Sequence, residues 1–257
     1  MYKFDAKKVK DELVQWMRDW ESENAKGCNF ILGISGGKDS TIVAALLKEC
    51  FGPERVYGVM IPCGEQKDID VSRRVIETLG INSMEVNIKD AVNAVVNGIE
   101  CKVYDGSQKE SGMLMISNQT QTNIPPRVRM TVLYAISQSL NGRVIGTCNL
   151  SENYIGYLTI HGDGASDCEP LANLTVQEVK AIGYELGIPG EFIEKIPDDG
   201  LPCSTSDEQK FGFTYKVLDQ YIRTGEIEDL AIKEKIDGMH KRNLFKLQPI
   251  ATFDPKL

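Results

Sequence analysis

The sequence predicts a three-layer, doubly wound α/β fold, in which helices flank both faces of a mostly parallel sheet. Two observations support this prediction. Short apolar runs alternate with helix-like segments, and a glycine-rich turn joins the first apolar run to a helix. Such alternation implies parallel strands connected by crossover helices. The length of 257 residues and the apolar content of 42% suit one large domain with a core of normal size.

The predicted strands are short and contain β-branched residues. The first is Phe30–Ile34, which we interpret as a buried strand because all its residues are apolar except Gly33. Further strands are predicted at 55–61, 84–87 and 143–146. The helices expected beside them lie at 1–28, 40–50, 69–79 and from residue 89 onward. A capping box of Thr175 and Glu178 opens another helix, which should end at Gly187.

Two segments lack a regular pattern. Residues 104–123 are polar and are expected to form a loop, after which a helix should resume beyond Pro125 and Pro126. Residues 196–213 carry glycines, prolines and acidic residues, and we expect a lid there. The chain is therefore expected to be one domain over 1–257, with a core at 29–190 and a helical C-terminal segment at 214–257.

The composition argues against nucleic acids and membranes as partners and favours a cytoplasmic location. A net charge of −8 argues against a nucleic acid as the main partner. No apolar run approaches the roughly 18 residues that a membrane-spanning helix needs, so no membrane association is expected. The seven cysteines form no Cys-x-x-Cys pair, which fits reduced thiols and a cytoplasmic protein.

The segment Gly33–Ser40 is the most informative part of the sequence. It follows a buried strand and opens a helix, which is where open α/β sheets bind ligands. Gly36 and Gly37 allow the backbone to approach an anion, and the free N–H groups of the helix start favour phosphate. The spacing differs from a Walker A loop, because Lys38 is followed by Asp39. An acidic side chain tolerates phosphate best across a divalent cation, which makes Asp39 a candidate Mg²⁺ ligand.

The string Ser35-Gly36-Gly37-Lys38-Asp39-Ser40 resembles the signature of the ATP-pyrophosphatases, which cleave ATP between the α and β phosphates. Other segments, in the same order along the chain, resemble the ammonia-dependent NAD⁺ synthetases over about residues 30–245. These segments are Pro62–Gln66, Asn123–Met130, Gly146–Glu152, Gly162–Asp167 with Pro170-Leu171, and His240–Arg242. The resemblance implies a Rossmann-like sheet of the adenine nucleotide alpha hydrolase type.

The resemblance also implies roles for individual residues. Asp39 and Glu152 match the Mg²⁺ ligands and, with Ser40, the catalytic group. Residues that match contacts to ATP are Gly33, Ile34, Ser35, Gly36, Gly37, Lys38, Asp39, Ser40, Met60, Gln66, Thr147 and Lys180. Residues expected at deamido-NAD⁺ are Arg127, Asp167, His161, His240 and Lys241, of which the last two often come from the other subunit of a homodimer.

Three positions depart from the family pattern. Val176 stands where many relatives have a lysine, and Lys180, one helical turn later, is a candidate replacement. Ile160, beside His161, replaces a lysine that contacts the dinucleotide, and Asp198 replaces a lid serine or threonine. These changes indicate either a subfamily or a shifted substrate.

The resemblance implies an amidation in two steps. The carboxylate of deamido-NAD⁺ attacks ATP, giving an adenylate and pyrophosphate, and ammonia then displaces AMP to form NAD⁺. We expect free ammonia as donor, because the residues before Phe30 leave no room for a glutaminase. Three alternatives stay open: another ATP-pyrophosphatase such as a GMP synthetase-like amidase or a tRNA thiolase, a non-catalytic nucleotide sensor, and a structural module.

Overall fold

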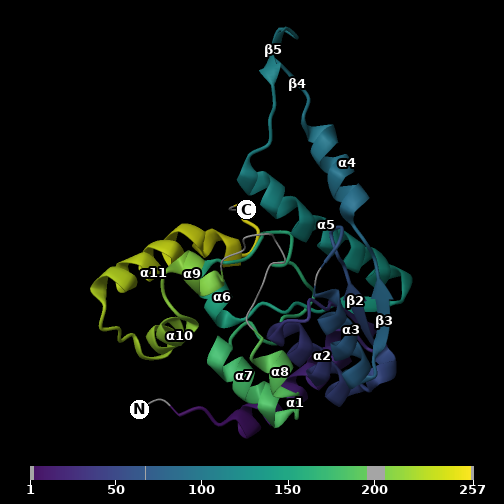
Figure 1. Cartoon of the computed structure of the whole chain (residues 1–257), viewed down its shortest axis with the longest axis vertical. Helices are drawn as coiled ribbons and strands as arrows, with labels where there is room; N and C mark the ends of the chain where they lie inside the picture. The colour runs from purple at the N-terminus through teal and green to yellow at the C-terminus, as the bar shows by residue number, and fades with distance from the viewer. Residues whose placement is uncertain (1–2, 67, 196–205, 256–257) are drawn as a thin grey trace.

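The fold is built on a four-stranded parallel sheet, as the sequence predicts. A computed structural model describes residues 3–66, 68–195 and 206–255 (Figure 1). The sheet has the order β3 (Asn82–Glu85), β2 (Val56–Met60), β1 (Asn29–Gly33) and β6 (Gly142–Val144), and every neighbouring pair is parallel. The two central strands therefore end beside each other, which brings the segments that follow them to one edge.

Helices cover both faces of this sheet, so the three-layer prediction is confirmed. Alternate residues of β1 face opposite layers: Phe30 and Leu32 belong to one apolar cluster and Ile31 to the other. The first cluster packs against α1 (Ala6–Asn24), α2 (Lys38–Phe51), α3 (Ile69–Leu79) and α7 (Val176–Glu185). The second packs against α4 (Lys89–Ile99) and α5 (Asn118–Ser139).

The C-terminal part forms a third apolar cluster beside the sheet. It gathers side chains from α6, α9, α10 and α11, including the fully buried Leu218 and Ile236. Figure 1 shows these helices side by side next to the central layers. Their bounds are α6 Leu150–Ile155, α9 Asp207–Phe211, α10 Tyr215–Thr224 and α11 Leu230–Asn243. The short helix α8 (Gly190–Ile193) packs in the first cluster, and 3-10 turns lie at η1 Pro53–Arg55 and η2 Leu244–Leu247.

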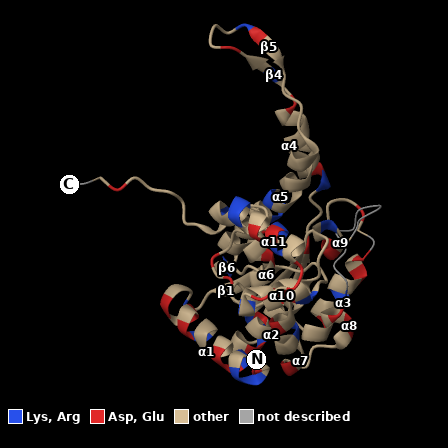
Figure 2. Cartoon of the chain, turned by 90° about the vertical axis from the view of Figure 1, so that its left-hand side faces the viewer, with Lys and Arg blue, Asp and Glu red and all other residues tan. Residues whose placement is uncertain are grey.

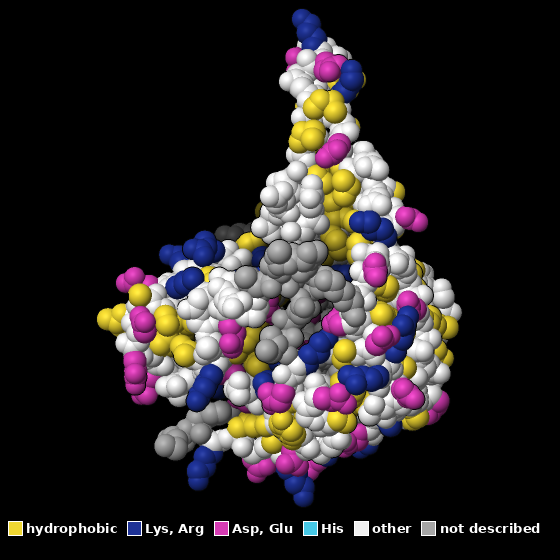
Figure 3. Space-filling model, viewed as in Figure 1, with side chains coloured by type: hydrophobic (Ala, Val, Ile, Leu, Met, Phe, Trp, Pro, Cys, Tyr) yellow, Lys and Arg dark blue, Asp and Glu magenta, His cyan; other side chains and the backbone are white. Residues whose placement is uncertain are grey.

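An arm projects from the body where the sequence suggested only a loop. It consists of α4, the antiparallel pair β4 (Lys102–Tyr104) and β5 (Glu110–Met113), and the first turns of α5 (Figure 1). Every residue of β4 and β5 is exposed, and Figure 3 shows apolar side chains along the arm and at its base.

One other boundary prediction is wrong, and the lid at 196–213 stays a prediction. The helix expected after Pro125 and Pro126 already begins at Asn118, because Ser117 caps it by accepting from the N–H of Thr120. Both prolines therefore lie inside α5. The carbonyl groups left without a donor belong to Gln121 and Thr122, which are exposed, so that water can satisfy them. The loop expected at 196–213 lies partly outside the described residues, and its described part contains α9, capped by Ser206.

The surface carries mixed charge. Figure 2 shows acidic and basic residues interspersed along the helices, and the C-terminal end of the chain extending away from the body. Within the described residues, no helix is both long and apolar enough to cross a membrane.

Candidate active site

The segment Gly33–Ser40, which we call the phosphate loop, joins the end of β1 to the start of α2. Gly36 has a φ of +75°, and a Cβ there would lie 3.1 Å from the backbone nitrogen of Ser72, so glycine is required for both conformation and space. The Ser35 hydroxyl accepts from the N–H of Gly37 at 3.2 Å and lies 3.2 Å from the Ser40 hydroxyl. These contacts hold the loop open toward the pocket at the helix start.

A pocket of about 200 Å³ opens at this loop. The phosphate loop and the segment after β6 supply its walls: Ser35, Gly37, Asp39, Ser40, Thr147, Cys148, Glu152, Tyr157 and Asp163. The structure thus brings together the predicted residues Ser35, Asp39, Ser40, Thr147 and Glu152 from segments more than a hundred positions apart in the sequence. Its lining includes three carboxyl groups but no lysine or arginine, which favours a cation as one of its occupants.

Asn149 links the two predicted metal ligands. Its side chain accepts from the backbone N–H of Glu152 at 3.1 Å, and its amide nitrogen donates to Asp39 Oδ1 at 3.2 Å. Asn149 is fully buried and is the N-cap of α6, in a reciprocal capping box with Glu152. One side chain therefore fixes the start of the helix that carries Glu152 against the helix that carries Asp39.

Burial and charge perturb the carboxyl groups of the pocket. Burial raises the pKa of Glu152 to about 8, and the neighbouring Asp39 adds to this rise. Lys38 is nearly buried, and its ammonium pairs with Asp39 Oδ2 at 2.8 Å. Burial alone would lower the pKa of Lys38, but Asp39 and Glu152 outweigh it and raise that pKa. The Lys38 ammonium is thus the single positive charge beside the carboxyl groups of Asp39 and Glu152, so it does not neutralise both of them when they are ionised.

Other predicted ATP contacts lie outside the lining of this pocket. Met60 is buried at the end of β2, and Gln66 donates to Asp68 at 2.9 Å. Lys180, the suggested replacement for the family lysine, pairs with Glu194 at 2.6 Å. Val176 is buried in the third apolar cluster, so it has a packing role at the position where the family pattern suggested a lysine.

The residues predicted at the dinucleotide lie on the surface around the pocket. Arg127 is exposed, and its Nε donates to the carbonyl of Ile160, the residue before the exposed His161. Asp167 accepts from the Tyr134 hydroxyl at 3.2 Å. These contacts place Arg127 beside the loop of His161 and connect α5 to Asp167.

His240 and Lys241 lie on α11. The His240 ring stacks on Tyr154 of α6 with centroids 4.2 Å apart, and its Nδ1 lies 2.7 Å from the Tyr154 carbonyl oxygen. Lys241 is exposed. Neither residue lines the pocket of this chain.

Sequence reasoning assigned no role to three residues of the pocket lining, Cys148, Tyr157 and Asp163, or to Asn149, which contacts Asp39. Asn149 carried a readable signal, because an asparagine three residues before a glutamate is a helix-start pattern. Cys148 and Asp163 lay within segments of the resemblance, but neither was given a role. Tyr157 had no distinguishing pattern, and only the fold shows that it lines the pocket.

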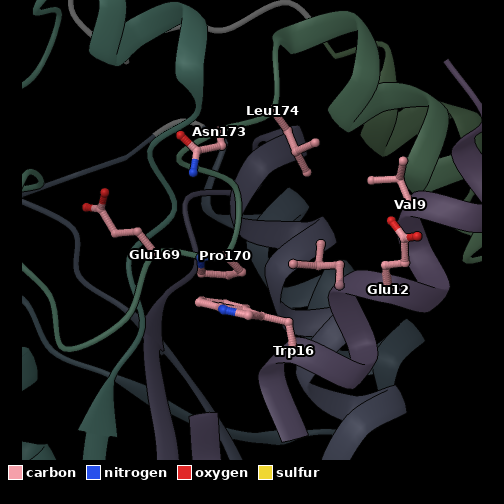
Figure 4. A pocket seen from close by; sticks show the side chains of 8 residues that line it. Val9, Glu12, Trp16, Glu169, Pro170, Asn173 and Leu174 are labelled. Carbon is pink, nitrogen blue, oxygen red and sulfur yellow. The ribbon is translucent and has the colours of Figure 1, made fainter. Parts of the chain in front are cut away.

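A second cavity lies away from this site. It has a volume of about 300 Å³ and lies between α1 and the segment 169–174. Figure 4 shows Trp16 beside Pro170, with Val9 and Leu174 nearby. None of the predicted site residues lines it.

Comparisons with known proteins agree with the geometry. The family model described as NAD synthase matches residues 9–251. The chain is 35% identical over 239 residues to an NH(3)-dependent NAD(+) synthetase of Alkaliphilus oremlandii, covering 91% of this chain and 94% of the relative. It is 38% identical over 236 residues to a protein of the same name from Thermococcus sibiricus, covering 91% and 86%.

Two solved structures are similar over almost the whole chain. An NMN synthetase from Francisella tularensis has a TM-score of 0.83 at 30% identity, covering 99% of this chain and 100% of that protein. An NH3-dependent NAD synthetase from Campylobacter jejuni has a TM-score of 0.76 at 24% identity, covering 98% and 100%.

Proposed function

This chain belongs to the NAD synthase family, and we propose that Asp39 and Glu152 form the catalytic metal site of its reaction. That reaction is the ATP-dependent amidation of deamido-NAD⁺ by ammonia, which produces NAD⁺. The observation that carries the proposed site is Asn149, whose side chain donates to Asp39 and whose backbone N–H donates to the Glu152 carboxylate.

The donor set fits Mg²⁺. Carboxylate oxygens are the ligands that Mg²⁺ prefers, and the ion commonly takes only one or two carboxylates plus substrate phosphates and water. The raised pKa of Glu152 supports the fit, because a cation would offset the charge that burial and Asp39 disfavour. When bound, Mg²⁺ would neutralise phosphate charge on ATP.

The residues of the phosphate loop serve the first step. The substrate carboxylate attacks the α-phosphorus of ATP, an acyl adenylate forms, and pyrophosphate leaves with its added charge. The N–H groups at the start of α2 and the hydroxyls of Ser35 and Ser40 are positioned to donate to that pyrophosphate. Ammonia then attacks the carbonyl carbon of the adenylate, AMP leaves, and the ammonium nitrogen loses a proton to give the amide.

Oxygen transfer tests this mechanism. Deamido-NAD⁺ labelled with ¹⁸O in its carboxylate should deliver one labelled oxygen to AMP in each turnover, because the adenylate retains that oxygen. Label found in pyrophosphate, or absent from AMP, would contradict attack on the α-phosphorus. Asp39→Ala and Glu152→Ala should both suppress the transfer if these carboxylates form the metal site.

Two observations favour a second acceptor. The Francisella protein, named an NMN synthetase, has a higher TM-score and identity than the Campylobacter NAD synthetase. Ile160 also stands where the resemblance to the family predicts a lysine at the dinucleotide. We therefore propose activity with the deamido form of NMN, measured as the ratio of kcat/KM for the two acceptors. A ratio of at least about a hundred in favour of deamido-NAD⁺, roughly 2.7 kcal/mol, would exclude this second activity.

The projecting arm is the proposed contact of a homodimer. A two-stranded hairpin is only marginally stable alone in water, and this one exposes a row of apolar side chains. These are Val103, Tyr104, Met113, Leu114 and Met115, each 40–66% exposed. The same arm on a second copy presents the same surface, as a symmetric dimer requires. Light scattering should give a dimer mass for the wild type and a monomer mass for Met113→Asp/Met115→Asp.

We propose a cytoplasmic location. The six described cysteines (Cys28, Cys50, Cys63, Cys101, Cys148 and Cys168) are free thiols, which suits a reducing compartment. Cell fractionation should recover the protein with cytoplasmic marker enzymes, and recovery with an exported marker would contradict the proposal.

A further inference from the structure

The hydroxyl of Tyr215 is buried without a partner. Tyr215 begins α10 and is 6% exposed, with its ring edge-on to Phe211 at a centroid distance of 6.0 Å. Its backbone N–H donates to Glu208, but among the described residues its Oη has no hydrogen bond. Leaving a buried hydroxyl unsatisfied is unfavourable, and such a group in a native fold calls for an explanation, often an absent ion or water.

The surroundings of this hydroxyl point to the metal site. The ammonium of Lys38, which pairs with Asp39, lies 5.7 Å from the Tyr215 ring centroid. Burial raises the pKa of the Tyr215 hydroxyl, and the next largest contribution is the negative charge of Glu152, followed by that of Asp207. Tyr215 therefore lies beside Lys38, whose ammonium pairs with the proposed metal ligand Asp39.

One carboxylate oxygen of Glu152 accepts no hydrogen bond from the described residues. Its Oε2 accepts from the backbone N–H of Asn149 at 3.4 Å, and no hydrogen bond to its other oxygen occurs within the described parts of the chain. An ionised carboxylate only accepts hydrogen bonds, and a carboxylate that binds a metal is commonly held by a further donor.

We infer that Tyr215 is a positioning residue for Glu152, whose carboxylate accepts a hydrogen bond from the Tyr215 hydroxyl when the pocket holds its divalent cation. The inference rests on the proposed metal site of Asp39 and Glu152. In this arrangement the hydroxyl destabilises the metal-free protein and stabilises the metal-bound one. Tyr215 consequently acts through Glu152 and does not touch the substrate.

The same helix supplies a matched control. Tyr221 also lies on α10 and packs in the same apolar cluster, but its hydroxyl donates to Asp237 at 2.7 Å. Neither tyrosine is part of the pocket lining. Tyr221→Phe removes a hydrogen-bonded hydroxyl, whereas Tyr215→Phe removes an unsatisfied one whose ring lies beside Lys38.

The experiment measures two quantities on the full-length wild type, Tyr215→Phe, Tyr221→Phe and Glu152→Gln. Electron paramagnetic resonance gives the affinity for Mn²⁺ without nucleotide, and calorimetry in EDTA gives the melting temperature. Tyr215→Phe should bind Mn²⁺ about tenfold more weakly than the wild type. In EDTA it should melt at the wild-type temperature or above.

Tyr221→Phe should show the opposite pattern, with wild-type affinity for Mn²⁺ and a melting temperature lower by about 2–4 °C. Wild-type Mn²⁺ affinity in Tyr215→Phe would overturn the inference, and so would a fall in its metal-free melting temperature as large as that of Tyr221→Phe. Failure of the wild type to bind Mn²⁺, or unchanged binding by Glu152→Gln, would overturn the metal site itself and the inference with it.

Discussion

Replacing Glu152 with glutamine is expected to stabilise the metal-free protein while it abolishes activity. Glu152 lies in the pocket beside Asp39, and burial together with that neighbour raises its pKa to about 8 from an ordinary value of 4.5. Glutamine has nearly the same shape but no charge. The substitution therefore removes an unfavourable ionisation together with a proposed metal ligand.

The size of the effect follows from the pKa. At about 1.36 kcal/mol per pKa unit, the full difference corresponds to about 5 kcal/mol. Glu152 keeps contact with solvent through the pocket, and Lys38 offsets part of its charge, so we take about half of this value. Glu152→Gln should thus raise the free energy of unfolding by about 2–3 kcal/mol at pH 8.

The pH dependence has a defined sign. The folded protein keeps the proton on Glu152 to higher pH than the unfolded chain, so the wild type loses stability between about pH 4.5 and pH 8 and levels off above. Glu152→Gln lacks this loss. The difference between the two proteins should therefore be near zero at pH 4 and grow toward pH 8.

Urea unfolding in EDTA from pH 4 to pH 9 measures this difference. Glu12→Gln is the control, because the Glu12 side chain is 64% exposed and its removal should leave the pH profile of the wild type unchanged. If Glu152→Gln and the wild type lose stability in parallel as pH rises, Glu152 does not carry a raised pKa and the reasoning fails.

Three further outcomes are expected. Arg223→Met should lower the free energy of unfolding by about 3 kcal/mol, measured by urea titration. The reason is that it removes the guanidinium that pairs with the Glu178 carboxylate, whose side chain is only 3% exposed. The control Arg73→Met removes a guanidinium from an exposed ion pair and should leave the free energy of unfolding unchanged. Gly156→Ala should lower stability by about 2–4 kcal/mol, because Gly156 has a φ of +68° and a Cβ would lie 2.0 Å from Cβ of Asn243; an unchanged melting curve would contradict this. The Mn²⁺ affinity of the wild type should rise roughly tenfold per pH unit from pH 6 to about pH 8, because the buried carboxyl of the pocket must lose its proton; a flat profile would exclude that coupling.

Local patterns made much of the fold predictable. The continuous apolar run at the first strand, the amphipathic helix at 69–79 and the capping box of Thr175 and Glu178 are short-range signals, and each matches the structure closely. The arm was not predictable in this way. Its strands are polar and fully exposed, so they show no hydrophobic alternation, and α5 contains prolines that suggest a helix start.

The site residues could be predicted where the functional groups are neighbours in the sequence. The phosphate loop needs glycines and hydroxyls in sequence, whereas the contact between Asn149 and Asp39 joins positions 110 apart. Lys38 illustrates the limit, because its place in the loop suggested a phosphate contact but its side chain pairs with Asp39. Side-chain direction depends on packing, which a single sequence does not display.

The most direct test of the account is the stoichiometry of one reaction. Purified protein is given Mg-ATP, deamido-NAD⁺ and an ammonium salt, and NAD⁺, AMP and pyrophosphate are counted together for the wild type, Asp39→Ala and Glu152→Ala. The account predicts equimolar appearance of the three products in the wild type and loss of all three in both variants. AMP and pyrophosphate without NAD⁺, ADP in place of AMP, or wild-type turnover in either variant would contradict it.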